Sequence, residues 1–186
     1  APKVLKHNLR AKAVLCAGLK ISFLDEASGE STVWQYEDGL RDYLKHALND
    51  VECLPAPAFY YRDELGDPAG SEFAFCWSDS SVITESYVNL IPTAQGGTHV
   101  NGLRTGVLEA LREFCDLHSL LPRSTRLSAE DVWDGVNFVL SLKIKEPQFS
   151  GQTKERLSNR EAAQLVAAQA KDSFSLWLNQ NTEVAT

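Results

Sequence analysis

The chain has 186 residues, of which 44% are hydrophobic and 23% are charged. This balance is typical of a folded globular domain and excludes a disordered, polar chain. A chain of this length buries roughly 70% of the surface that its unfolded form exposes, so its core needs no disulfides. The 25 acidic and 18 basic residues leave a net charge of −7, which argues against a phosphate-binding surface over the whole domain.

The four cysteines, at positions 16, 53, 76 and 115, form no Cys-x-x-Cys pair and have no histidines at zinc-ligand spacing. This arrangement indicates a reducing compartment without a structural metal. No apolar run approaches the roughly 18 residues of a membrane span, and the first residues lack the apolar region of a signal peptide. We therefore expect a cytoplasmic protein with no membrane segment. Because the chain contains no methionine, we also expect it to be a piece of a longer protein.

The basic residues are concentrated towards the C-terminal half. Residues 120–160 carry seven cations and five anions, which makes this window +2 and the remainder −9. A polyanionic partner, if the protein has one, is therefore expected to bind in this half.

The first half of the chain predicts two helices on either side of a hairpin. Apolar residues recur at intervals of three and four over 4–16 and over 39–49, and predict a helix in each range. Between them, 21–36 holds two strand-like runs around a turn-rich stretch, 27–31, which predicts a β-hairpin. The segment 55–70 has three prolines, two glycines and a run of charge. We expect it to loop out.

Two strands and a long helix are expected next. The strands lie at 72–78 and 83–91, and Pro92 then blocks further pairing because proline cannot donate to a ladder. A continuous apolar stripe predicts a helix over 99–121, which Pro122 ends.

The last third predicts a strand between two helices. Ser128 caps a short helix, and 136–145 alternates between apolar and polar residues, which indicates a strand with one core face and one partly polar face. After the polar loop 147–156, Ser158 and Glu161 open the last helix with capping-box spacing. The order of the elements predicts an α+β fold, with helices on one face of a mostly antiparallel sheet.

Three places carry residues that could bind a ligand, and the first is the run Gln95-Gly96-Gly97-Thr98-His99. Its paired glycines permit a sharp turn, and Thr98 can cap the helix that follows. Free amides at a helix N-terminus attract anions. A tight strand-to-helix turn explains the same residues, and spacing alone favours that simpler interpretation.

The second place is the loop 150–154, Ser-Gly-Gln-Thr-Lys, in which Gln152 and Lys154 suit a terminal phosphate. The loop is not a Walker sequence, and spacing alone favours a solvated lysine. The third place is Arg104, beside the apolar stripe of the long helix, for which simple exposure is the alternative. No histidine is placed in the sequence for a catalytic triad, and the acidic residues form no metal-binding pattern.

The sequence segments that contain these residues resemble the motifs of a known family. Residues 86–104, Ser-Tyr-Val-Asn-Leu-Ile-Pro-Thr-Ala-Gln-Gly-Gly-Thr-His-Val-Asn-Gly-Leu-Arg, are similar to the transducer-domain motif of bacterial type IIA topoisomerases. Residues 146–157, Glu-Pro-Gln-Phe-Ser-Gly-Gln-Thr-Lys-Glu-Arg-Leu, resemble the second motif of that family. The runs at 38–44, 127–133 and 174–181 look like the B-subunit of topoisomerase IV rather than that of gyrase. The resemblance spans nearly the whole chain and weakens between Pro55 and Ser80.

The resemblance implies a domain organisation. Residues 19–182 would form a transducer domain with a ribosomal protein S5 domain 2-like fold. Residues 1–18 would be the trailing helix of a preceding ATPase domain, and 183–186 would begin the link to a Toprim region.

The resemblance also implies roles for the candidate residues. In the family the Gln-Thr-Lys loop reaches the nucleotide, so Gln152 and Lys154 would contact the γ-phosphate of ATP, with Gly151 and Thr153 shaping the loop. Arg104 would line the cavity that captures a DNA duplex. The family's catalytic glutamate and its Toprim acidic cluster have no counterpart in this sequence, so no catalytic residue is expected here.

The function implied is that of the ATP-hydrolysing subunit of an ATP-dependent type II topoisomerase, in which this domain relays ATP binding to gate closure and DNA strand passage. ATP and Mg²⁺ would serve the complete enzyme, and we expect neither to bind this chain alone. The implied partners are the A-subunit of topoisomerase IV, DNA, the protein's own ATPase domain and a second copy of the B-subunit. The alternative is a stand-alone S5-like nucleic-acid-binding module without ATP coupling.

Overall fold

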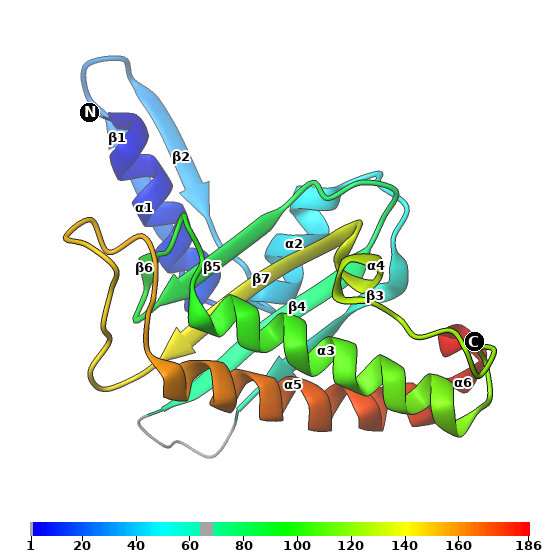
Figure 1. Ribbon diagram of the computed structural model, residues 1–186. Coiled ribbons are helices and arrows are strands. Elements are labelled where there is room, and N and C mark those ends of the chain that lie inside the picture. The colour runs from blue at the N-terminus through cyan, green and yellow to red at the C-terminus, as the bar shows by residue number, and fades with distance from the viewer. Residues whose placement is uncertain (1, 64–68) are drawn as a thin grey trace.

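The computed structural model describes residues 2–63 and 69–186. Its centre is a five-stranded sheet in the order β3-β4-β7-β5-β6 (Figure 1). The strands are β3 (Leu54–Arg62), β4 (Gly70–Trp77), β5 (Thr84–Val88), β6 (Ile91–Pro92) and β7 (Val136–Lys143). β7 pairs in parallel with β5, and the other pairs are antiparallel. The predicted α+β class and mostly antiparallel sheet are confirmed.

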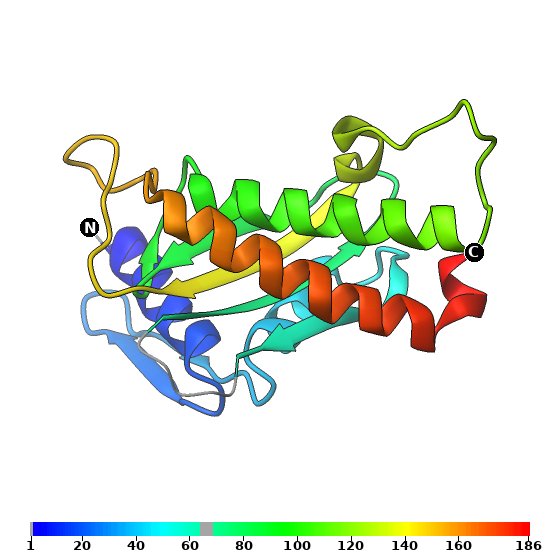
Figure 2. The same cartoon turned by 60° about the horizontal axis from the view of Figure 1, so that its bottom comes forward.

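Helices cover both faces of this sheet. Figure 2 shows α3 (Thr98–Leu117) and α5 (Arg160–Gln180) side by side on one face, with α1 (Pro2–Leu15) and α2 (Leu40–Leu48) on the other. The prediction of helices on one face only is therefore wrong. The second face carries the buried residues Ala74, Cys76, Tyr87 and Val139, which pack against α1 and α2.

The helices on both faces of the sheet also explain why β7 is buried. Seven of its eight residues are buried, all but Lys143 at its end. The face predicted to be partly polar carries Asn137, Ser141 and Lys143, and all of it except Lys143 is buried. Its polar residue Asn137 is buried because hydrogen bonds satisfy its amide: the side-chain oxygen accepts from the amides of Val82 at 2.6 Å and Ile83 at 3.1 Å. Buried polar groups are tolerated where they find such partners.

The main core lies between the sheet and the pair α3 and α5. Phe75 of β4 meets Phe174 of α5 edge to face, with ring centroids 5.0 Å apart, and Leu103, Leu140 and Val166 are fully buried in the same core. Aromatic rings of this size dominate the burial of apolar surface. This packing holds α3 and α5 in fixed positions over the sheet.

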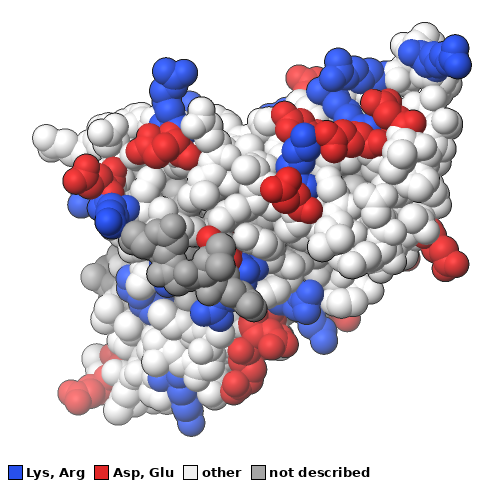
Figure 3. All heavy atoms as spheres, turned by 90° about the horizontal axis from the view of Figure 1, so that it is seen from below, with Lys and Arg blue, Asp and Glu red and all other residues white. Residues whose placement is uncertain are grey.

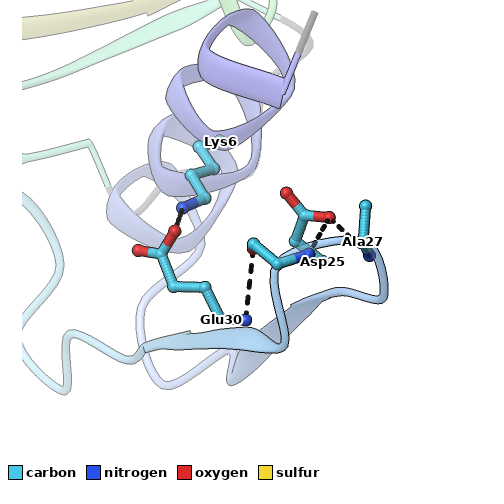
Figure 4. A network of polar contacts seen from close by, with 5 residues as sticks. Lys6, Asp25, Ala27 and Glu30 are labelled. Carbon is cyan, nitrogen blue, oxygen red and sulfur yellow. Dashed lines mark hydrogen bonds and ion pairs between the residues drawn. The ribbon is translucent and has the colours of Figure 1, made fainter.

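The predicted hairpin is confirmed as β1 (Ile21–Asp25) and β2 (Glu30–Trp34), which pair with each other and form a separate two-stranded sheet. The Asp25 carboxylate accepts the Ala27 amide at 3.0 Å in the turn, as Asp side chains commonly do. Figure 4 shows this turn and the ion pair of Lys6 on α1 with Glu30 on β2, whose atoms are 2.9 Å apart. The hairpin is thereby fastened to α1.

The segment expected to loop out at 55–70 is largely a strand, because β3 runs from Leu54 to Arg62. β3 is the edge strand beside β4, where prolines 55 and 57 need not supply an amide to a second neighbour. Residues 64–68 of the predicted loop lie outside the described residues.

Several boundaries differ from those predicted. The strand expected at 83–91 is interrupted after Val88, and Pro92 pairs with Tyr87 at the outer edge of the sheet. α3 ends at Leu117, before the predicted end at 121.

The caps of the later helices differ as well. α4 (Ala129–Trp133) has the capping box of Ser128 and Asp131. α5 begins after Asn159 rather than with a box of Ser158 and Glu161, because the Ser158 hydroxyl donates to the Gln148 carbonyl instead. A last short helix, α6 (Thr182–Ala185), follows α5.

Candidate functional site

The two motifs singled out in the sequence lie against each other in the structure. The turn before α3 and the base of the loop 149–157 are joined by three backbone hydrogen bonds: Gln95 amide to Glu155 carbonyl at 2.9 Å, Thr98 amide to Leu157 carbonyl at 3.1 Å, and Leu157 amide to Gly96 carbonyl at 3.1 Å. The Gln95 side chain adds a bond to the Glu155 carboxylate at 2.9 Å. Residues 95–98 therefore form a support for the loop.

Two expectations for the first motif, residues 95–99, are wrong. Thr98 makes no side-chain cap, since Gly97 is the N-cap residue of α3 and no side-chain cap bond forms. The amides of Gln95 and Thr98 are not free to bind an anion, because carbonyls of the loop occupy them. The motif serves as a turn that holds the second motif.

Gly97 permits the close contact. Its backbone has φ 137° and ψ −160°, a region open essentially to glycine. A methyl group at this position would lie 2.5 Å from the Leu157 amide nitrogen and closer still to the Leu157 carbonyl oxygen. Any other residue would push the loop base away from the turn.

The loop itself closes like a hairpin and exposes its tip. Phe149 and Leu157 form an antiparallel bridge, and the Ser150 amide donates to the Arg156 carbonyl at 2.9 Å. Between them Gly151, Gln152, Thr153 and Lys154 are all exposed. The Lys154 side chain has no hydrogen bond or ion pair with any residue in the described part of the chain. Its ammonium group is thus available to a ligand from outside.

The exposed tip projects from one end of the molecule. Figures 1 and 2 show the loop, drawn in yellow and orange, at the end where α1 begins, while the last residues lie at the opposite end. The structure brings Gly151, Gln152, Thr153 and Lys154 together on this tip, and it places Arg104 elsewhere, on α3.

Arg104 is half-buried rather than exposed. Its Nε atom is buried and has no hydrogen-bond partner in the described part of the chain. A buried guanidinium nitrogen without a partner is costly, so this side chain has an unused capacity to donate.

Beneath the turn lies a buried polar network. His99 is fully buried; its Nε2 atom lies 3.1 Å from the Thr93 hydroxyl, which is 2.7 Å from the Ser86 hydroxyl. Burial lowers the pKa of His99 to about 4, because desolvation disfavours the charged imidazolium. His99 is therefore a neutral structural residue at physiological pH.

Comparison with known proteins places this geometry in a family. The sequence profile of DNA gyrase B matches residues 39–186. The chain belongs to the DNA gyrase B family. The B-subunit of DNA topoisomerase 4 from Pseudomonas aeruginosa is 54% identical over 186 residues, which covers 97% of this chain and 29% of that protein. Its Haemophilus influenzae counterpart is 52% identical over 187 residues, with the same two shares. The DNA gyrase B-subunit of Thermotoga maritima is 32% identical over 190 residues, covering 98% of this chain and 30% of that protein.

Solved structures of the family have the same fold. The topoisomerase IV ATP-binding domain of Francisella tularensis, solved with a small-molecule inhibitor, matches with a TM-score of 0.84 and 42% identity, over 98% of this chain and 49% of that chain. The 43K ATPase domain of Thermus thermophilus gyrase B, solved with an aminocoumarin, matches with a TM-score of 0.84 and 27% identity, over 100% of this chain and 50% of that chain. The chain thus spans under a third of its sequence relatives and about half of these domains.

This family member has no single-sign surface on the side that Figure 3 shows, where blue and red side chains are interspersed. On α5, Lys171 pairs with Glu113 of α3 at 2.8 Å. Within residues 2–63 and 69–186, no three His, Cys, Asp or Glu side chains gather as a metal site requires. Among the same residues, no helix is both long and apolar enough to cross a bilayer.

Sequence reasoning missed the residues that join the two motifs. Glu155 and Gln95 are 60 positions apart, and nothing in the spacing of either motif indicates that they meet. The signal that existed was the pair of glycines, because a glycine beside a strand end often marks a close backbone approach.

Proposed function

We propose that this chain is the transducer domain of the ATP-hydrolysing subunit of a type II DNA topoisomerase of the topoisomerase IV type. The 54% identity to the B-subunit of a DNA topoisomerase 4 over 97% of the chain supports this proposal, as do the two motifs. We assign to it the S5 domain 2-like fold that the resemblance implies, with 1–18 as the connection to an ATPase domain and 183–186 as the start of a connection to a Toprim region.

The observation that carries the proposal is the supported, exposed loop tip. Lys154 and Gln152 stand on a tip that makes few contacts of its own, while the base of the loop is bonded to the turn before α3. Such a loop can place a cation and an amide donor on a phosphate that another domain holds. In this role Lys154 and Gln152 contact the ATP γ-phosphate, and Gly151 and Thr153 shape the tip.

The loop fits a role in sensing nucleotide more closely than one in chemistry. ATP hydrolysis requires a positioned water and a Mg²⁺ ion that neutralises charge on the phosphates, and these belong to the complete enzyme. Removal of the γ-phosphate would release Lys154, and the loop would pass that change to α3 through Gln95 and Thr98. The domain would thereby link nucleotide state to gate closure and DNA strand passage.

Arg104 and the partners complete the proposal. We assign Arg104, which is half-buried on α3, to a surface that meets the DNA duplex, where its guanidinium can donate to a phosphate. The partners are DNA, the A-subunit of topoisomerase IV, the protein's own ATPase domain and a second copy of the B-subunit. The interspersed charges of Figure 3 and the net charge of −7 disfavour the alternative of an independent nucleic-acid-binding module.

The proposal is tested by comparing Lys154→Ala with Arg156→Ala in the complete enzyme. Both residues are cations of the same loop, but only Lys154 stands at the tip. We expect Lys154→Ala to reduce ATP turnover by about 10- to 150-fold, the equivalent of losing one hydrogen bond to a charged group worth about 1.5–3 kcal/mol, and Arg156→Ala to change it by less than about threefold. Equal effects, or normal turnover in Lys154→Ala, would refute the assignment.

A further inference from the structure

A carboxylate held by two tyrosines lies on the face of the sheet opposite α3. The Glu85 carboxylate of β5 accepts a hydrogen bond from the Tyr43 hydroxyl of α2 at 2.6 Å and another, on its second oxygen, from the Tyr87 hydroxyl of β5 at 2.6 Å. Both tyrosine side chains are buried. Burial and the carboxylate raise the pKa of both hydroxyls, so each remains a donor at neutral pH.

α1 contacts this cluster. The guanidinium of Arg10 lies over the ring of Tyr43, 5.5 Å from its centroid, and Tyr43 also meets Tyr36 edge to face at 5.6 Å. The strand β5 and two helices therefore converge around Glu85. Short hydrogen bonds fix direction as well as distance, whereas apolar contacts alone permit sliding.

A second contact ties α1 to the turn that follows β5. The Lys12 ammonium donates to the Leu90 carbonyl at 3.2 Å. The neighbouring Asn89 side chain locks this turn to the end of β7, donating to the Ile144 carbonyl at 2.8 Å and accepting the Ile144 amide at 3.0 Å. The turn between β5 and β6 is thus fixed from both sides.

The same turn leads directly to the support of the Lys154 loop. The Ser86 hydroxyl of β5 donates to the Thr93 carbonyl at 3.0 Å, and two residues later Gln95 bonds to Glu155. β5, β6 and residues 93–98 therefore stand between α1 and the loop, with polar contacts on each side. Figure 1 shows α1, β5, β6 and the loop gathered at one end of the molecule.

We propose that Glu85, Tyr43 and Tyr87 form a positioning cluster that makes α1, α2 and β5 move as one body with the Lys154 loop. The proposal rests on the proposed function of that loop. When nucleotide binding moves the loop, α1 moves with it, because the helices cannot slide over the sheet. In this proposal the cluster acts through the Lys154 loop, so its residues are positioning residues.

The chain offers a matched control. The Tyr60 hydroxyl of β3 donates to the Glu72 carboxylate of β4, also at 2.6 Å. This bond has the same chemistry and length, but it joins neighbouring strands at the far edge of the sheet, away from β5 and the loop. Removing it perturbs stability in a similar way without touching the proposed connection.

The test is made in the complete enzyme with Tyr43→Phe plus Tyr87→Phe, against Tyr60→Phe. ATP turnover and DNA strand passage are measured together, with a thermal melt for each variant. We expect the double variant to keep ATP turnover within about twofold and to lose about fivefold or more in strand passages per ATP hydrolysed, the lower bound of a typical coupling between sites. Tyr60→Phe should keep the wild-type ratio.

The inference is overturned if the double variant keeps the wild-type ratio, or if Tyr60→Phe lowers it equally. Should the double variant fail to fold, Tyr43→Phe alone decides by the same ratio, because Glu85 then keeps its bond to Tyr87. Normal ATP turnover in Lys154→Ala would instead refute the proposed function. Loss of turnover in Lys154→Ala with an unchanged ratio in the tyrosine variants would refute only the cluster.

Discussion

The junction between the two motifs predicts a large cost for Gly97→Ala. A non-glycine residue in the backbone region of Gly97 is strained by about 1–3 kcal/mol. The added methyl group would meet the Leu157 backbone, with the amide nitrogen 2.5 Å away, and such overpacking costs about 1–3 kcal/mol more. The free energy of unfolding should therefore fall by about 2–6 kcal/mol.

Gly151→Ala is the control that separates backbone strain from the contact between position 97 and the Leu157 backbone. Gly151 also has a positive φ, 95°, but a methyl group there would meet nothing within 4 Å. Its cost should be limited to backbone strain, about 1–3 kcal/mol. Urea unfolding followed by tryptophan fluorescence gives both values, and equal destabilisation by the two changes would show that the turn and the loop base are not packed together as described.

Other predictions concern the core, the buried histidine and nucleotide binding. Leu140→Ala should destabilise the fold by about 2–5 kcal/mol, while the exposed Lys143→Ala stays within about 0.5 kcal/mol; similar denaturant melts would mean that β7 is wrongly oriented. Because the pKa of His99 is about 4 in the folded state and about 6.5 when unfolded, the unfolded chain takes up the proton first. The free energy of unfolding should fall by up to about 3 kcal/mol as the pH drops from about 6.5 to 4, and His99→Gln should lack this part of the fall. If the free energy of unfolding depends on pH in the same way in both proteins, the prediction is contradicted. The chain alone should bind ATP more weakly than micromolar, because Gln152 and Lys154 offer too few contacts to offset the cost of association, and calorimetry showing micromolar affinity would contradict this.

Features set by local chemistry were predictable from the sequence. The apolar stripe of α3, the turn between β1 and β2 and the cap of α4 by Ser128 all depend on residues a few positions apart, and each formed as expected. β3 did not follow its local composition. Its prolines indicate a loop, but its place at the edge of the sheet tolerates them, and that place depends on strands far away in the sequence.

The burial of both faces of the sheet could not be predicted for a similar reason. Alternation along β7 indicates a partly polar face with Asn137 and Ser141, but it does not indicate that α1 and α2 cover this face or that hydrogen bonds satisfy Asn137. Periodicity reports which side chains are apolar, and it cannot report a second layer contributed by another part of the chain.

At the site, the sequence located the loop and left its surroundings undetermined. Lys154 and Gln152 were recognised from a short run of residues, while the support from Gln95 and the cluster at Glu85 join elements more than 40 positions apart. These contacts exist only in the folded chain.

The most direct test of the proposed function is a structure of the complete ATPase region with a non-hydrolysable ATP analogue. The account predicts that the Lys154 ammonium lies about 2.7–2.9 Å from a γ-phosphate oxygen, the distance of a charge-assisted hydrogen bond, with Gln152 beside it and the bonds from Gln95 and Thr98 to the loop retained. A nucleotide bound with Lys154 still surrounded by solvent would contradict it.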